Sequence, residues 1–136
     1  MIARSPARVL YVLKLADNCY YVGTTSHFKM RMQQHCNGTA CAWTRRHLVQ
    51  RLHSQEWVAG SIAGFLEDAK VLEMMARVGV ANVRGGTYNR VHFDDATLRE
   101  IQRKLWHNAG QCTQCGSAEH FAKDCVRISA ALPGKK

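Results

Sequence analysis

The stretch from Leu10 to His35 constrains the fold of this chain more than any other part of its 136 residues. Val9–Leu15 is rich in β-branched and long apolar residues, which predicts a strand. Cys19–Gly23 predicts a second short strand after turn chemistry at Asp17-Asn18. The residues from Phe28 onward follow the period of an amphipathic helix, which Thr25 or Ser26 could cap. The segment therefore predicts a β-hairpin with a helix packed against it.

Two polar side chains fall on the side of this helix that should face the hairpin. At about 100° per residue, Arg31 and His35 share a stripe with Phe28 and Met32. A guanidinium that is removed from water needs a partner or a function, because unpaired burial of a charge is costly. Arg31 and His35 are therefore candidate functional residues.

The length of the hairpin loop decides where two tyrosines lie. A three-residue loop, Ala16–Asn18, needs a left-handed residue, which Asn18 tolerates, and it places Tyr11 and Tyr21 on one face of the sheet. A two-residue loop would place them on opposite faces. Two phenols beside Arg31 favour the first arrangement, and the alternative is that both are ordinary strand aromatics.

The spacing of these residues resembles the signature of the GIY-YIG nuclease family. The similarity rests on Tyr11, Tyr21-Val22-Gly23, Arg31 and His35. Val9-Leu10 replaces the first Gly-Ile of the family's name, and Val22 replaces its second Ile. Cys36–His47 also resembles the Gly and Trp-Thr segment that follows in several branches. The resemblance implies an α/β (α+β) fold with a small mixed sheet flanked by helices.

The resemblance also implies a chemistry for the four polar residues. Tyr11 would activate the attacking water as a general base, while Tyr21 and His35 would position or share the proton. Arg31 would stabilise the charge of the phosphorane-like transition state. A free phenol with a pKa near 10 is a poor base, which explains why a cation and an imidazole would be needed beside it.

A helix predicted over Glu67–Val78 ends at Gly79. Glu67 shares the apolar side of this helix with Val71, whereas Glu73 lies on the opposite side beside Arg77. The nuclease family places a single metal-binding glutamate in this region, so the resemblance assigns Mg²⁺ or Mn²⁺ to Glu67. The alternative for Glu67 is a first-turn acid that offsets the helix dipole.

Three further residues in this part of the chain are candidate site residues. Asp68 is a second candidate for the metal. Asn82 or Asn89 could correspond to the asparagine that closes the family's active site. We prefer Asn82, because it directly follows the loop after the helix.

The charge of the chain favours a polyanionic partner. The net charge is +9, and residues 1–60 carry eight Lys and Arg against two acids. Such an excess is typical of nucleic-acid binding, and the family resemblance favours DNA over RNA. Arg45 and Arg46, near Trp43, and Arg84 are the candidate phosphate contacts. A solvated basic surface without a partner is the alternative.

The C-terminal part carries a zinc-knuckle pattern, C-x2-C-x4-H-x4-C, at Cys112, Cys115, His120 and Cys125. Three thiolates and one imidazole suit one tetrahedral, structural Zn²⁺. Knuckles bind single-stranded nucleic acid by stacking bases on aromatics, and here Phe121 is the candidate, because Thr113 occupies a position that is often aromatic. With the Asn82–Gly86 run, this motif resembles GIY-YIG proteins of large DNA viruses and some protists.

The predicted organisation is a nuclease-like domain at 1–92, a connecting helix at 93–108 packed on it, a knuckle at 109–128 and a flexible tail at 129–136. No run approaches the length of a membrane span, and Met1–Arg8 lacks the apolar segment of a secretory signal. We therefore expect a soluble intracellular protein, nuclear or cytoplasmic. The sequence does not indicate an oligomeric state.

The predicted function is a metal-dependent endonuclease that hydrolyses phosphodiester bonds in DNA, with structure-selective cleavage as one form of it. The alternative is a nucleic-acid-binding protein on the same scaffold that no longer cuts. A structural or interaction protein, for which the charge and the knuckle are incidental, is a third interpretation.

Overall fold

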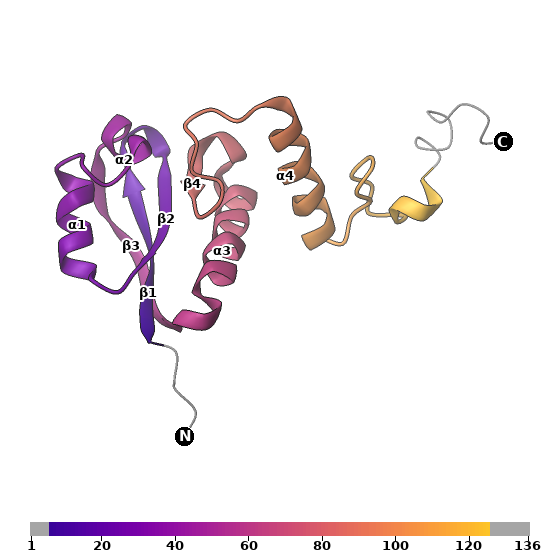
Figure 1. Cartoon of the computed structure of the whole chain (residues 1–136). Coiled ribbons are helices and arrows are strands. Elements are labelled where there is room, and N and C mark those ends of the chain that lie inside the picture. The colour runs from indigo at the N-terminus through magenta and orange to yellow at the C-terminus, as the bar shows by residue number, and fades with distance from the viewer. Residues whose placement is uncertain (1–5, 126–136) are drawn as a thin grey trace, which may run out of the picture. The chain divides into compact units, whose positions relative to one another are not determined.

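A four-stranded mixed sheet forms the centre of the computed structural model, which describes residues 6–125 (Figure 1). Its strands are β1 (Ala7–Leu15), β2 (Tyr20–Thr25), β3 (Val49–Ala59) and β4 (Val83–Gly85). The spatial order is β3-β1-β2-β4. β1 pairs antiparallel with both β2 and β3, and β2 pairs parallel with β4.

Helices cover both faces of this sheet (Figure 1). α1 (Phe28–Cys36) and the short α2 (Ala42–Arg46) lie on one face, and α3 (Ala63–Val78) lies on the other. A fourth helix, α4 (Asp95–Asn108), follows in the C-terminal part. The predicted fold class, a small mixed sheet flanked by helices, is confirmed.

The chain divides into two compact units, Met1–His92 and Phe93–Lys136. The second unit contains α4 and the Cys/His motif. The packing of α4 on the first unit and the finer division of the C-terminal part stay predictions. The expected tail at 129–136 lies outside the described residues.

The hairpin has the three-residue loop that the tyrosine spacing favoured. The Leu15 N–H donates to the Cys19 carbonyl at 2.8 Å, and a 3-10 turn fills the loop between them. Asn18 adopts the expected positive φ of 60°, and Asp17 adopts one of 62°. Both residue types tolerate the left-handed conformation. The loop therefore fixes the β1–β2 register.

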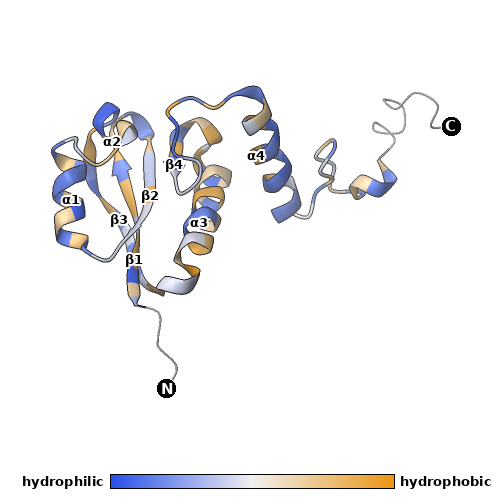
Figure 2. Ribbon diagram, in the orientation of Figure 1, coloured by the Kyte–Doolittle hydropathy of each residue, from blue (hydrophilic) through white to orange (hydrophobic). Residues whose placement is uncertain are grey.

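Alternation along β1 separates two buried layers. The middle of this strand is coloured as hydrophobic in Figure 2. From Val9 onward, the odd-numbered residues of β1 join the cluster under α1 and α2, which includes Trp43 and Tyr21. The even-numbered residues Leu10 and Val12 are buried as well, and by alternation they face α3. This double burial explains why β1 has a nearly continuous apolar sequence.

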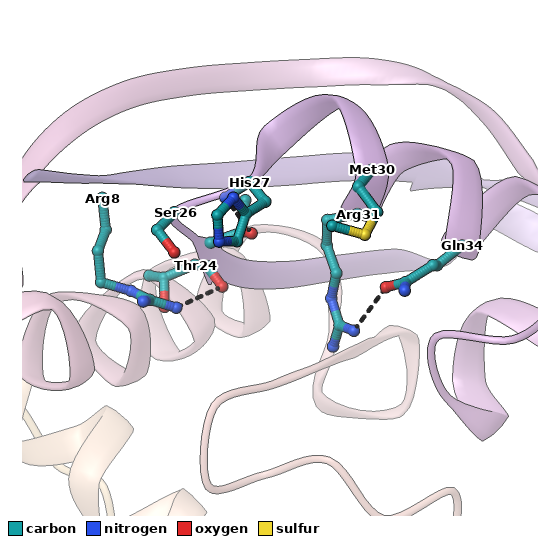
Figure 3. A pocket seen from close by; sticks show the side chains of 8 residues that line it. Arg8, Thr24, Ser26, His27, Met30, Arg31 and Gln34 are labelled. Carbon is teal, nitrogen blue, oxygen red and sulfur yellow. Dashed lines mark hydrogen bonds between the residues drawn. The ribbon is translucent and has the colours of Figure 1, made fainter.

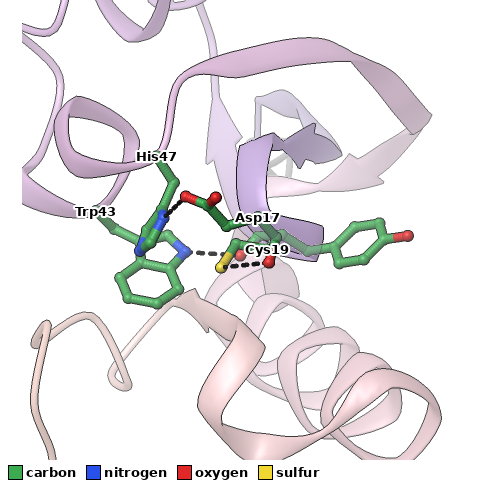
Figure 4. Close-up of polar contacts among 5 residues, drawn as sticks. Asp17, Cys19, Trp43 and His47 are labelled. Atoms are coloured by element: carbon green, nitrogen blue, oxygen red, sulfur yellow. Dashed lines mark hydrogen bonds and ion pairs between the residues drawn. The ribbon is translucent and has the colours of Figure 1, made fainter.

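Polar contacts join the hairpin loop to α2 (Figure 4). The Trp43 indole N–H donates to the Tyr20 carbonyl at 2.9 Å, and His47 Nδ1 lies 3.0 Å from Asp17 Oδ2. The Cys19 thiol donates to the Asp17 carbonyl at 3.6 Å. The buried Trp43 ring thereby holds α2 against the end of the hairpin.

Several boundaries differ from the sequence expectation. β3 is a single strand over Val49–Ala59, a segment for which no clear prediction could be made from the sequence, because β1 pairs with it along almost its whole length. α1 begins after His27, whose N–H donates to Thr25 Oγ1 at 3.0 Å, so neither Thr25 nor Ser26 is the N-cap. α3 begins at Ala63, so Glu67 is not in its first turn and does not act there on the helix dipole.

The start of α4 agrees with the sequence. Asp94 is its N-cap, and the carboxylate accepts the Thr97 N–H at 2.8 Å.

Among the helices of residues 6–125, none combines the length and the apolar character that a membrane span needs.

Candidate active site and metal centre

Two tyrosines and a histidine meet beneath α1. The Tyr11 hydroxyl lies 2.7 Å from His35 Nε2, and the rings of Tyr11 and Tyr21 have their centroids 6.3 Å apart. The Tyr21 and His35 centroids are 4.9 Å apart. The tyrosines therefore share one face of the sheet, as predicted, with His35 facing them from the helix.

A hydrogen-bond chain continues from His35 to α2. His35 Nδ1 lies 2.9 Å from the Thr44 hydroxyl, which lies 3.4 Å from the Cys41 sulfur. Both ring nitrogens of this buried imidazole are thus engaged. A neutral imidazole can accept the Tyr11 proton at Nε2 while it donates from Nδ1 to Thr44. The arrangement can accept a proton from the phenol.

Gly23 provides the space for the phenols. It lies opposite Tyr11 in the β1–β2 ladder. A Cβ at this position would lie 2.5 Å from the Tyr11 hydroxyl oxygen and 3.0 Å from Tyr21 Cε2. No side chain fits there without displacement of a catalytic candidate, which explains the glycine of the Tyr-Val-Gly tripeptide.

Burial controls the ionisation of the group. It raises the pKa of Tyr11 to about 12, although a hydrogen bond and the positive charge of Arg31 oppose this change. Burial also raises the pKa of Tyr21. Burial, reinforced by the charge of Arg31, lowers the pKa of His35 to about 4. At neutral pH both phenols are protonated and the imidazole is neutral.

The lowered pKa of His35 predicts a pH-dependent stability. Unfolding restores a pKa near 6.5, so the unfolded chain binds the proton more tightly and acid favours unfolding. The contribution is complete above pH 6.5 and is lost as the pH falls towards 4. We expect the unfolding free energy to fall between pH 7 and pH 4 by about 3 kcal/mol more in the parent than in His35→Gln. Urea unfolding at both pH values measures this, and equal pH dependence would contradict it.

A cleft of about 360 Å³ opens beside this group (Figure 3). Its lining residues come from the ends of β1 and β2 and from α1: Arg8, Thr24, Thr25, Ser26, His27, Met30, Arg31 and Gln34. Arg8 and Arg31 lie on either side of His27 in this view, so two guanidiniums line the opening. Arg31 Nη1 donates to Gln34 Oε1 at 3.0 Å. The cleft suits a phosphate group.

Glu67 reaches this region from α3. β4 pairs with β2 only from Tyr20 to Val22, so it leaves the edge of β2 from Gly23 onward uncovered. Burial and the negative charge of Asp68 raise the pKa of the half-buried Glu67, although hydrogen bonds from Thr24 and the charge of Arg8 oppose this change. The negative charge of Glu67 also raises the pKa of both Tyr11 and Tyr21. The carboxylate therefore lies within electrostatic range of the phenols.

The surroundings of Glu67 fit a hard divalent cation. A half-buried carboxylate with a raised pKa is stabilised by a positive charge placed beside it. A Cβ at Gly86 would clash with Asp68 Oδ1, so this glycine accommodates the Asp68 carboxylate next to Glu67. Mg²⁺ accepts one carboxylate together with waters and substrate phosphate oxygens. Glu67 would hold such an ion at the edge of the sheet.

The other acids of α3 have structural partners. Asp68 accepts the Thr87 N–H at 2.9 Å and the Thr87 hydroxyl at 3.0 Å, so it ties the loop after β4 to the helix. Glu73 is exposed and pairs with Lys70 at 2.7 Å. The predicted partner Arg77 contributes less to the lowered pKa of Glu73 than Lys70 does.

Asn82 lies at the far end of α3. Its amide donates to the Val78 carbonyl at 2.6 Å and so closes the C-terminus of the helix. Glu67 and Val78 are separated by about 16 Å along the helix axis. The structure therefore does not bring Asn82 to the Glu67 carboxylate.

Arg84 is a buried structural residue, which corrects its assignment as a phosphate contact. Its guanidinium donates to four carbonyls at 2.7 to 3.0 Å and lies 4.6 Å from the centroid of the Trp43 ring. These carbonyls belong to Val80, Val83, Arg90 and Val91. Arg84 thus binds the segments around β4 to the core. Arg45 and Arg46 are exposed on α2 and stay candidate phosphate contacts.

The C-terminal motif forms a compact cluster. The ligand atoms of Cys112, Cys115, His120 and Cys125 all lie within 4.8 Å of one another. Tetrahedral Zn²⁺ with bonds of about 2.3 Å needs separations near 3.8 Å, so the donor set and its spacing fit this ion. Phe121, the predicted stacking residue, is 62% exposed beside the cluster.

Zinc content tests this cluster. Protein purified without chelator should contain one zinc per chain, and Cys115→Ser should lose it, because three ligands hold zinc weakly and the short segment has little core of its own. Cys36→Ser is the matched control, since Cys36 is exposed on α1 and outside the cluster. Metal analysis of the three proteins measures the difference. A parent protein without zinc would contradict the assignment.

Comparison with known proteins agrees with this geometry. Residues 8–65 match the family model of the GIY-YIG catalytic domain. The match includes Tyr11, Tyr21, Arg31 and His35, and it ends two residues before Glu67. Neither a curated protein nor a solved structure matches the chain. The match supports a nuclease-type domain with a nucleic-acid substrate.

Sequence reasoning missed the residues that surround the polar group. Thr44 binds the imidazole, and Arg8 holds Thr24 with a contact of 3.2 Å from Nη2 to the Thr24 carbonyl. Thr44 belongs to the Trp-Thr pair that carried part of the resemblance, so a signal was present. The role of Arg8 depends on a contact between residues 16 positions apart, and no local pattern indicates it.

Proposed function

We propose that the first unit is a metal-dependent endonuclease that hydrolyses phosphodiester bonds, with DNA as the preferred substrate. The main support for this proposal is the 2.7 Å contact between the Tyr11 hydroxyl and His35 Nε2. This contact lies within the matched segment and beside a cleft lined by Arg8 and Arg31. The Tyr11 hydroxyl can donate to this neutral imidazole, and a cation beside the phenol would lower its pKa and ease the loss of its proton. The narrower similarity to proteins of large DNA viruses and protists stays part of this proposal.

The proton moves along the hydrogen-bond chain. As water attacks the phosphorus, Tyr11 takes the water proton and passes its own hydroxyl proton to His35 Nε2, while Thr44 accepts the bond from Nδ1. The new oxygen–phosphorus bond forms, the opposite phosphorus–oxygen bond breaks, and the leaving oxygen takes up a proton from solvent. Tyr21 packs against the imidazole and keeps it in place.

Arg31 would stabilise the transition state. Its guanidinium lies at the cleft and next to Tyr11, so it can donate to the phosphate oxygens as negative charge develops on them. Glu67 would hold a divalent cation, and that ion supplies Lewis-acid activation of the phosphate and lowers the pKa of the nearby phenol. The raised pKa of Tyr11 makes such a cation necessary at neutral pH.

A panel of labelled substrates tests this proposal. Single strands, duplexes, flaps and four-way junctions of DNA and RNA are incubated with the full chain, with and without added Mg²⁺ or Mn²⁺. Omission of the ion is preferable to a chelator, which would also remove zinc. Cleavage that requires the added ion is the expected result. Binding without cleavage of any substrate would favour a scaffold that no longer cuts.

A further inference from the structure

A second cleft lies in the C-terminal unit, between α4 and the first loop of the Cys/His cluster. Its volume is about 310 Å³, and its lining residues are Arg99, Gln102, Arg103, Trp106, Thr113 and Gln114. The four residues from α4 are spaced i, i+3, i+4 and i+7, which places them on one side of the helix. The cleft is therefore built by one helix stripe and one loop.

The loop is seated directly on the helix. A Cβ at Gly116 would lie 2.7 Å from both Cε2 and Nε1 of Trp106, so the indole packs against the backbone at this glycine. The Gln111 N–H also donates to the Trp106 carbonyl at 2.8 Å. Gly116 has a φ of +83°, which favours glycine at this position. These contacts give the cleft a defined shape.

The charges along α4 leave two guanidiniums available to a ligand. Glu100, between them in sequence, pairs with Lys104 at 3.2 Å. The ion pairs among residues 6–125 do not include Arg99 or Arg103, and both side chains are exposed. A planar guanidinium binds phosphate oxygens through two parallel hydrogen bonds.

We propose that this cleft binds one nucleotide of single-stranded nucleic acid. The base would stack on the Trp106 indole, and Arg99 and Arg103 would contact its phosphates. Only an unpaired base exposes a face to such an aromatic ring. Trp106 would thus supply the aromatic ring that knuckles often have at the position of Thr113.

This assignment rests on the proposed nuclease function, because that function identifies the ligand as nucleic acid. The cleft would hold an unpaired part of the substrate. It predicts a preference for substrates with a single-stranded segment, such as flaps, over fully paired duplexes.

Binding of a labelled single strand to the full chain tests the cleft. The zinc-loaded protein, without Mg²⁺, is titrated against a fluorescent strand of about 12 nucleotides, and anisotropy is recorded at several salt concentrations. The double variant Arg99→Ala with Arg103→Ala should bind about tenfold more weakly, and its salt slope should fall by about 1.4, because two phosphate contacts are lost. Lys104→Ala, one residue away on α4, should change the affinity by less than about twofold, since it does not line the cleft.

Three outcomes would overturn the proposal: a parent chain that does not bind the strand, a double variant that binds like the parent, or an equal loss in Lys104→Ala. The nuclease function fails separately. A parent that binds the strand but cuts nothing would refute cleavage and leave the cleft assignment intact. If the parent cuts its substrate and the double variant binds the strand as tightly as the parent does, only the cleft assignment is refuted.

Discussion

Glu67→Ala should reduce cleavage by about 10³-fold or more while the protein stays folded. Glu67 would be the carboxylate that brings the divalent cation to the edge of β2, where Thr24 and Arg8 fix its position. Without the ion, Tyr11 retains its raised pKa and cannot take the proton of the attacking water. Single-turnover cleavage in Mg²⁺, on a substrate that the parent cuts, measures the loss.

The stability of Glu67→Ala gives an independent readout. Burial raises the pKa of Glu67, so the ionised form opposes folding at neutral pH. Removal of the carboxylate should therefore leave the melting temperature unchanged or raise it. A variant that melts early would indicate a structural role for Glu67 instead.

Glu73→Ala is the matched control on the same helix. Glu73 is exposed, and its pair with Lys70 is an exposed i, i+3 contact. Its removal should cost at most about 0.5 kcal/mol and leave cleavage intact. Equal cleavage by Glu67→Ala and the parent would refute both the metal assignment and the proton transfer that depends on it.

The hairpin and its helix could be predicted because their signals are local. The turn residues, the alternation of β1 and the spacing of Arg31 and His35 all lie within one continuous segment. The loop length then followed from a chemical condition, that both tyrosines face Arg31. Both left-handed residues of the loop, Asp17 and Asn18, belong to types that tolerate this conformation.

The region around β4 could not be predicted in the same way. Val83–Gly85, within the Asn82–Gly86 run, adds a parallel strand to β2. A three-residue strand carries almost no periodic signal. The position of this strand depends on Arg84, whose guanidinium donates to carbonyls before and after the strand. It also depends on Gly85, where a Cβ would lie 2.0 Å from the Val22 carbonyl oxygen. These contacts are visible only in three dimensions.

The same limit applies to the choice of functional arginines. Arg31, Arg45 and Arg84 all occur near aromatic or glycine residues in the sequence, and composition does not rank them. The structure separates them by exposure and by partners. Arg31 lines the cleft, Arg45 is exposed on α2, and Arg84 is 5% exposed with its donors satisfied by carbonyls. A buried guanidinium with fixed carbonyl partners cannot also bind phosphate without disruption of the core.

Gly23→Ala should impair both cleavage and folding, because the packing of the two phenols depends on the absence of a side chain. The added Cβ would lie 2.5 Å from the Tyr11 hydroxyl oxygen and 2.7 Å from Tyr11 Cζ, so the ring must shift, and this disturbs its 2.7 Å contact with His35 Nε2. We expect the unfolding free energy to fall by about 1–3 kcal/mol, as for other overpacked cores. Cleavage should fall by about 10²-fold, because the proton-transfer contact of Tyr11 with His35 is displaced.

Gly64→Ala separates this steric effect from the general effect of a glycine substitution. Gly64 lies in α3, and a Cβ there would meet nothing within 4 Å. The same substitution should therefore stabilise the protein by up to about 1 kcal/mol, since alanine favours the helix more than glycine does, and it should not alter cleavage. Urea unfolding and single-turnover cleavage of both variants measure the contrast. If Gly23→Ala cut as fast as Gly64→Ala, the contact between Tyr11 and His35 would not be needed for catalysis, and the proposed proton transfer from Tyr11 to His35 would be refuted.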